Sequence, residues 1–127
     1  MNAGHESIMI VDRDKNFEFI KSELPPIGII KYFAESMVKS KKINLNEKTF
    51  VVYTDGVTEG YLKNGQELGA EGVEKIVKDI DNVTPKKIVD SIASELNWGI
   101  DKLRDDITCL ALDLSNTELI DKKKKKN

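Results

Sequence analysis

The chain has 127 residues, which is enough for one domain and too few for two comfortable ones. Hydrophobic residues make up 39% and charged residues 33%, and the apolar runs are short, which excludes a disordered chain and a membrane-spanning one. The formal net charge is −2, but without the five lysines of Lys122–Lys126 the body carries 15 basic against 22 acidic residues. An acidic body argues against a nucleic-acid-binding surface.

The ends of the chain and its single cysteine bear on location. The first residues, Met1 to Glu6, have neither a basic segment nor an apolar one, so no signal peptide is expected. Cys109 has no partner for an internal disulfide, which favours a reducing compartment, most simply the cytoplasm. The lysine-rich segment 116–127 is expected to be a solvated, disordered tail, although it has the charge to touch RNA, anionic lipid or an acidic partner.

The first half of the chain predicts strands. The apolar runs Ile8–Val11 and Phe17–Ile20 flank a polar turn and predict a β-hairpin. A loop follows at Leu24–Gly28, because its two prolines cannot continue a ladder or a helix. From Ala34 to Leu45 a strand pair or one long bent strand is expected. Thr49–Thr54 is β-branched and aromatic throughout, which predicts a strand in the centre of a sheet.

The second half predicts helices and one more strand. Asp55 to Gly65 is glycine-rich and is expected to be a loop. Apolar residues then recur at helical spacing from Val73 to Ile80, and again from Ile88 to Leu96. Thr84 and Pro85 begin the second helix, which is expected to end at Trp98–Gly99. Ile107–Leu112 is the last strand, so the order predicts an α+β fold with two helices on one face of an antiparallel sheet.

Acidic residues stand where two of the strands meet loops. Asp55 leaves the end of one strand, and Asp105 and Asp106 enter the start of another. If these strands are antiparallel neighbours, Asp55 and Asp105 converge at one edge of the sheet. Carboxylate oxygens suit hard divalent cations, and Gly56 permits a tight turn beside them. Plain turn chemistry is the alternative, because Asp-Gly is among the commonest turn pairs.

Four segments occur in a distinctive order. They are Asn2-Ala3-Gly4-His5, Leu24-Pro25-Pro26-Ile27-Gly28-Ile29, Tyr53-Thr54-Asp55-Gly56-Val57-Thr58-Glu59 and Asp105-Asp106-Ile107-Thr108. From about Asn2 to Leu114 this order resembles the C-terminal half of the SpoIIE/RsbU-like branch of the PPM-type, metal-dependent serine/threonine phosphatases. The resemblance implies residues 1–115 of a β-sandwich domain, with 116–127 as a tail beyond it.

The resemblance also implies chemistry. Family members hold two Mn²⁺ or Mg²⁺ ions, and water bridging the ions attacks a phosphate on serine or threonine. By match to the motif, Asp55 and Asp105 are metal ligands, with Gly56, Glu59 and Asp106 in possible supporting roles. The implied partner is a phosphorylated regulatory protein of bacterial signalling, such as an anti-sigma-factor antagonist. His5 marks a turn in this family rather than a catalytic base, and Cys109 is read as a small core residue rather than a nucleophile.

The sequence departs from the family in two places. The family's first metal motif, of the type Asp-x-x-Gly-His-Gly, precedes the Asn-Ala-Gly-His segment and does not occur in these 127 residues. The proline usual two positions after His5 is Ser7. These departures raise the alternative of a catalytically incomplete fragment that acts as a folding, binding or oligomerisation module, as a homodimer that covers its bared sheet. A small binding domain unrelated to phosphatases is a third reading, which requires the motif order to be accidental.

Overall fold

The fold is built on one antiparallel sheet. The computed structural model describes residues 1–32, 34–99 and 105–115, so the expected tail over 116–127 lies outside the described residues. The strands are β1 (Ile8–Asp12), β2 (Phe17–Ile20), β3 (Lys48–Tyr53) and β4 (Cys109–Asp113). Their order is β2-β1-β3-β4, and every neighbouring pair is antiparallel. The predicted hairpin and the central place of β3 are both confirmed.

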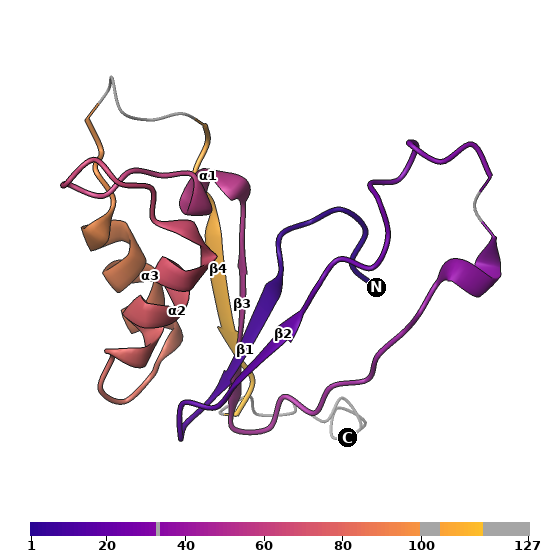
Figure 1. Cartoon of the computed structure of the whole chain (residues 1–127). Helices are drawn as coiled ribbons and strands as arrows, with labels where there is room; N and C mark the ends of the chain where they lie inside the picture. Colours follow the sequence, from indigo (N-terminus) through magenta and orange to yellow (C-terminus); the bar gives the residue numbers. More distant parts are fainter. Residues whose placement is uncertain (33, 100–104, 116–127) are drawn as a thin grey trace, which may run out of the picture.

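The helices are α1 (Asp55–Thr58), α2 (Gly69–Lys78) and α3 (Pro85–Glu95), with a short 3₁₀ helix, η1, at Glu35–Met37. Helices α2 and α3 lie together on one face of the sheet, and α1 lies at the end of β3 (Figure 1). The predicted start of α3 is confirmed, because the Thr84 hydroxyl accepts a hydrogen bond from the Lys87 amide at 3.3 Å. The α+β class predicted from the sequence is therefore the observed one. Within the described ranges no helix has the length and apolar character needed to cross a bilayer.

The core lies between the sheet and the two longer helices. Side chains alternate along β3, so Thr49, Val51 and Tyr53 are buried while the other residues of the strand are only partly covered. Val51 and Tyr53 form one apolar cluster with residues of α2 and α3, namely Val73, Val77, Ile88 and Ile92. Cys109 is partly buried against this cluster, and that burial raises the pKa of its thiol. The cysteine therefore packs as a small apolar residue, as the sequence predicts.

The N-terminal segment is a turn locked onto the loop that follows β2. Asn2 is 5% exposed and its side-chain amide donates to the carbonyls of Glu6 and Ile20. Gly4 has a φ of +74°, and a Cβ there would lie 2.3 Å from Cγ of Pro26, so only glycine fits. His5 is exposed, and its backbone amide donates to Oδ1 of Asn2 at 3.0 Å. This segment therefore serves as a turn into β1, as the resemblance implies.

Two predicted elements are wrong. The strand expected between Ala34 and Leu45 is absent from the described residues there, which form η1 and irregular chain. This stretch is mostly exposed and rich in lysine and serine, so a strand there would bury little apolar surface. The loop expected over Asp55 to Gly65 begins instead with α1, because the Asp55 carbonyl accepts from the Glu59 amide at 2.8 Å and from the Thr58 hydroxyl at 3.1 Å.

The end of α3 differs slightly from the prediction. The helix stops at Glu95 rather than at Trp98–Gly99. Trp98 is 52% exposed, and its indole N–H donates to the Ala93 carbonyl at 2.7 Å. The tryptophan thus satisfies one of the carbonyls that a helix leaves unpaired in its last turn.

Tyr53 gives a test of the core. Its side chain is 1% exposed, and its hydroxyl has no hydrogen-bond partner among the described residues. Tyr53→Phe should leave the free energy of unfolding unchanged or raise it by up to ~1 kcal/mol, because it removes a buried unpaired hydroxyl. Ile92→Ala, at another buried core position, should cost about 2–5 kcal/mol. Urea denaturation followed by circular dichroism measures both changes.

Tyr53 also predicts that the protein loses stability at high pH. Burial, followed by the nearby negative charge of Glu6, raises the pKa of Tyr53 above its ordinary 10.0. A group with a raised folded-state pKa contributes stability below its unfolded pKa and loses that contribution as pH rises through the folded value. The wild type should therefore lose more stability above pH ~10 than Tyr53→Phe does. If the free energy of unfolding fell equally with pH in both proteins, that result would contradict the burial of the Tyr53 phenol.

Candidate metal centre

The candidate site lies where β3 ends and β4 begins. The paired residues of these strands run from Thr49 opposite Asp113 to Tyr53 opposite Cys109. One more backbone bond continues the pairing, from the Thr54 amide to the Thr108 carbonyl at 3.0 Å. The chain before β4 therefore lies beside the chain after β3, as expected for antiparallel neighbours. Asp55 follows one of these segments, and Asp105 and Asp106 belong to the other.

Gly56 lies close against the backbone of the opposite segment. A Cβ on this residue would lie 2.2 Å from the carbonyl oxygen of Asp106 and 3.5 Å from that of Asp105. The glycine is buried in α1, between Asp55 and Val57. Because a side chain cannot be accommodated there, Gly56 is what lets α1 rest directly against the Asp105-Asp106 backbone.

The carboxylates themselves face solvent. Asp55, Glu59, Asp105 and Asp106 are all exposed. Asp105 Oδ1 accepts from the Asp106 amide at 2.7 Å, and no ion pair involves these four side chains among the residues described. Within the described ranges, several negative charges thus stand at one end of the sheet outside any ion pair. Like charges gathered in this way favour the binding of a cation.

The donor chemistry fits a hard divalent ion. Carboxylate and backbone oxygens are the ligands that Mg²⁺ and Mn²⁺ take, and Mg²⁺ keeps several waters when it binds. Over the described ranges, however, no group of three or more His, Cys, Asp or Glu side chains gathers closely enough to hold a metal. Asp55 and Asp105 therefore stay predicted ligands, and the residues at hand supply part of a coordination shell.

Thr54 is a site residue that motif matching does not single out. Its hydroxyl accepts from the Thr108 amide at 3.1 Å and lies 3.3 Å from the Asp106 carbonyl. The feature of the sequence that could have pointed to Thr54 is a threonine at the end of a strand, directly before Asp-Gly. That signal is weak, since threonine is common both in strands and before helices.

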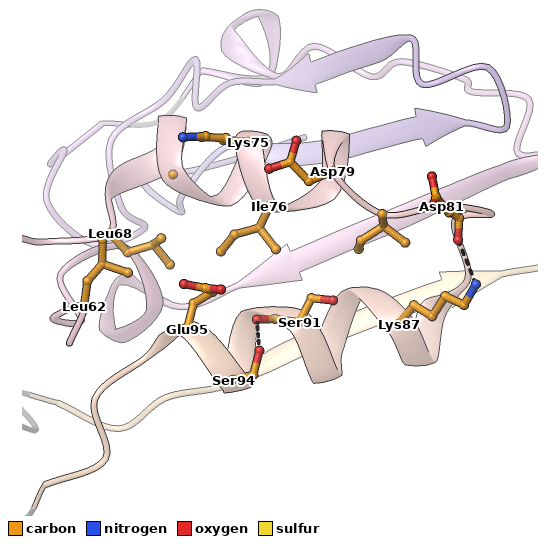
Figure 2. Close-up of a pocket in the computed structure, with 12 residues that line it drawn as sticks. Leu62, Leu68, Lys75, Ile76, Asp79, Asp81, Lys87, Ser91, Ser94 and Glu95 are labelled. Atoms are coloured by element: carbon orange, nitrogen blue, oxygen red, sulfur yellow. Dashed lines mark hydrogen bonds between the residues drawn. The ribbon is translucent and has the colours of Figure 1, made fainter. Parts of the chain in front are cut away.

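A groove lies between the two long helices (Figure 2). That groove has a volume of about 630 Å³. Figure 2 shows Ile76 on α2 facing the groove, with Lys75 and Asp79 of the same helix and Glu95 of α3 around it. Asp55 and Asp105 are not among its lining residues. The end of β3 that leads into Asp55 is thus an open edge of the sheet and is not part of this groove.

Comparison with known proteins identifies relatives. A family model described as Stage II sporulation protein E (SpoIIE) matches residues 1–115. A similar solved structure is the SiaA-PP2C domain of Pseudomonas aeruginosa, with a TM-score of 0.63 and 21% sequence identity. The match covers 84% of this chain and 42% of that chain, so this chain spans less than half of its structural neighbour. At this identity the likeness shows the fold alone. A comparison with curated proteins found no match.

Gly56 gives a test of the site's packing. Gly56→Ala should lower the free energy of unfolding by about 1–3 kcal/mol, because its Cβ meets a backbone carbonyl that cannot turn aside. Gly72→Ala is the matched control, since a Cβ there meets Cδ1 of Leu68 at 2.6 Å, the end of a flexible side chain. Alanine also favours the helix by about 1 kcal/mol, so this control should stay within about 1 kcal/mol of wild type. Equal losses for both variants in urea denaturation would contradict the close approach.

Proposed function

The chain belongs to the SpoIIE family, and on that premise we propose that it is the C-terminal part of a metal-dependent protein phosphatase domain. The proposed substrate is a phosphoserine or phosphothreonine on a regulatory protein, such as an anti-sigma-factor antagonist. The observation that carries the proposal is the meeting of Asp55 with the Asp105-Asp106 segment at the ends of β3 and β4. Such an exposed edge leaves room for a phosphorylated protein segment to approach.

Each residue has a proposed role. Asp55 and Asp105 hold the cations, as Mn²⁺ or Mg²⁺, while Gly56 keeps α1 against the segment that carries Asp105. In this proposal Glu59, the C-cap residue of α1, orients a water, and Asp106 holds water or the neighbouring loop. When bound, the cations acidify water and offset charge on the phosphoryl oxygens. The carboxylates in turn keep the cations at the exposed end of the sheet.

The complete reaction also needs ligands that these residues do not supply. No Asp-x-x-Gly-His-Gly segment occurs in the 127 residues, and this chain spans 42% of the solved neighbour. We therefore propose that Asp55 and Asp105 act together with carboxylates from outside this sequence. Phosphatase activity should therefore be measured on the polypeptide translated from the complete reading frame that contains these residues.

Substitution of the ligands tests this function. Asp55→Asn and Asp105→Asn should each lower Mn²⁺-dependent hydrolysis of p-nitrophenyl phosphate by on the order of 100-fold or more, because a lost ligand removes several kcal/mol of charge stabilisation. Asp79→Asn, on α2 and at the separate groove, is the control and should keep wild-type activity. Full activity in either ligand variant would rule out the assignment.

A second candidate function, a non-catalytic dimerisation module, has one observation in its favour. Leu110 and Leu112 on β4 are 54% and 42% exposed, on the sheet face opposite the helices. By register they stand beside Val52 and Phe50, so the four make an apolar patch at an edge strand. A second copy paired antiparallel along β4 about Ala111 would place each Leu110 beside the partner's Leu112, which is a self-complementary contact.

Sedimentation over a range of concentrations tests this alternative. The chain should form dimers, and Leu110→Lys should shift it to monomer because a lysine placed in an apolar contact is costly to desolvate. Ile29→Lys is the matched control, since Ile29 is 71% exposed but lies away from β4. A wild-type chain that stays monomeric at high concentration would exclude this module.

A further inference from the structure

Thr54 occupies an unusual position at the junction of β3 and α1. It follows the last residue of the strand and precedes the first residue of the helix, with extended backbone angles of −82° and 163°. This is the N-cap position, where a threonine hydroxyl ordinarily accepts a hydrogen bond from an amide of its own helix. No such bond forms at Thr54. Thr84 shows the ordinary use, because its hydroxyl caps α3 through the Lys87 amide.

The Thr54 hydroxyl is used across the sheet instead. It accepts from the Thr108 amide at 3.1 Å and is positioned to donate to the Asp106 carbonyl at 3.3 Å. Among the described residues, its one competing acceptor is the Thr108 carbonyl at 3.5 Å, which already receives the Thr54 amide at 3.0 Å. One hydroxyl has one donor and two acceptor lone pairs, so both shorter bonds can form at once. The side chain therefore continues the strand pairing beyond the last regular pair, Tyr53 with Cys109.

The residues joined in this way are the neighbours of the proposed ligands. Asp55 directly follows Thr54, and Asp106 directly follows Asp105. Without the hydroxyl, the Asp106 carbonyl and the Thr108 amide would lose their hydrogen bonds to Thr54 at the point where the two segments separate. The packing of Gly56 against the Asp106 carbonyl would then be the remaining close contact of that oxygen with α1. Contacts from Thr54 and Gly56, on either side of Asp55, thus hold one carbonyl in place.

We infer that Thr54 is a positioning residue, whose hydroxyl fixes the separation of Asp55 and Asp105 so that both bind one cation centre. The inference rests on the proposed function, because it assigns a ligand role to these two carboxylates. Thr54 itself contacts neither the cation nor the substrate. Its effect passes through the backbone of residues 106 to 108, and the hydroxyl rather than the methyl group carries it.

Binding of Mn²⁺ to the 127-residue chain tests the inference without any activity assay. Paramagnetic Mn²⁺ broadens the NMR signals of nearby backbone amides, so in the wild type the signals of residues 54–57 and 105–108 should broaden first as Mn²⁺ is added. Thr54→Val keeps the shape of the side chain and removes the hydroxyl. Thr54→Val should raise the Mn²⁺ concentration needed for the same broadening by roughly 10-fold. This is the lower end of the range for residues that orient metal ligands.

Two variants separate positioning from general stability. Thr54→Ser keeps the hydroxyl and should restore wild-type broadening. Thr84→Val removes the cap of α3, so it destabilises the chain but should leave Mn²⁺ binding unchanged. Equal weakening by Thr54→Val and Thr54→Ser would overturn the inference. Weakening by Thr84→Val as large as that by Thr54→Val would also overturn it, because stability alone would then explain the result.

Asp55→Asn distinguishes failure of the inference from failure of the proposed function. If Asp55→Asn leaves the broadening unchanged, Asp55 is not a ligand and the proposed function fails with the inference. If Asp55→Asn weakens binding and Thr54→Val does not, the ligand role stands and the positioning role is wrong. Should Thr54→Val fail to fold, hydrogen exchange of the wild type decides: the Thr108 amide should exchange slowly, and fast exchange would refute the bond to Thr54.

Discussion

The antiparallel pairing of β3 with β4 is the constraint on which the rest of the structure depends. Five residue pairs join these strands, which are 56 or more positions apart in the chain. Closing so long a loop costs conformational entropy, and the burial of the α2 and α3 faces against the sheet offsets that cost. The helices lie in the connection between the two strands, so the element that separates the strands in sequence is also what stabilises their pairing.

This arrangement explains why segments that resemble catalytic motifs have different physical roles. Asn2 and Gly4 are fixed by hydrogen bonds and by contact with Pro26, so the Asn-Ala-Gly-His segment is an anchor for β1. His5 contributes its backbone amide to this turn. By contrast, the carboxylates at the ends of β3 and β4 have no ion-pair partner in the described part of the chain. Charges without a structural partner are the better candidates for binding chemistry.

The parts of the fold that sequence predicts are those with a regular hydrophobic period. The hairpin follows from two apolar runs around a polar turn, and the faces of α2 and α3 follow from helical spacing. Two features escape this reasoning. Asp-Gly at residues 55 and 56 reads as a turn, but the nearby Asp106 carbonyl makes glycine necessary inside a short helix. The stretch from Ala34 to Leu45 contains apolar residues, yet it pairs with neither edge strand, β2 or β4, of the described sheet. Both outcomes depend on tertiary contacts that a local pattern does not contain.

The segment Tyr53 to Glu59 shows how few residues of a motif need to face the solvent. Tyr53, Gly56, Val57 and Thr58 are buried, and the Thr58 hydroxyl donates to the Asp55 carbonyl. Only Asp55 and Glu59 are exposed within it. Buried groups on both sides of an exposed carboxylate restrict its backbone, which lowers the entropy lost when it binds a ligand. The sequence string is therefore specific because most of its residues are needed to place two carboxylates, and the placement of Asp55 requires the opposite segment, 105–108, as much as the string itself.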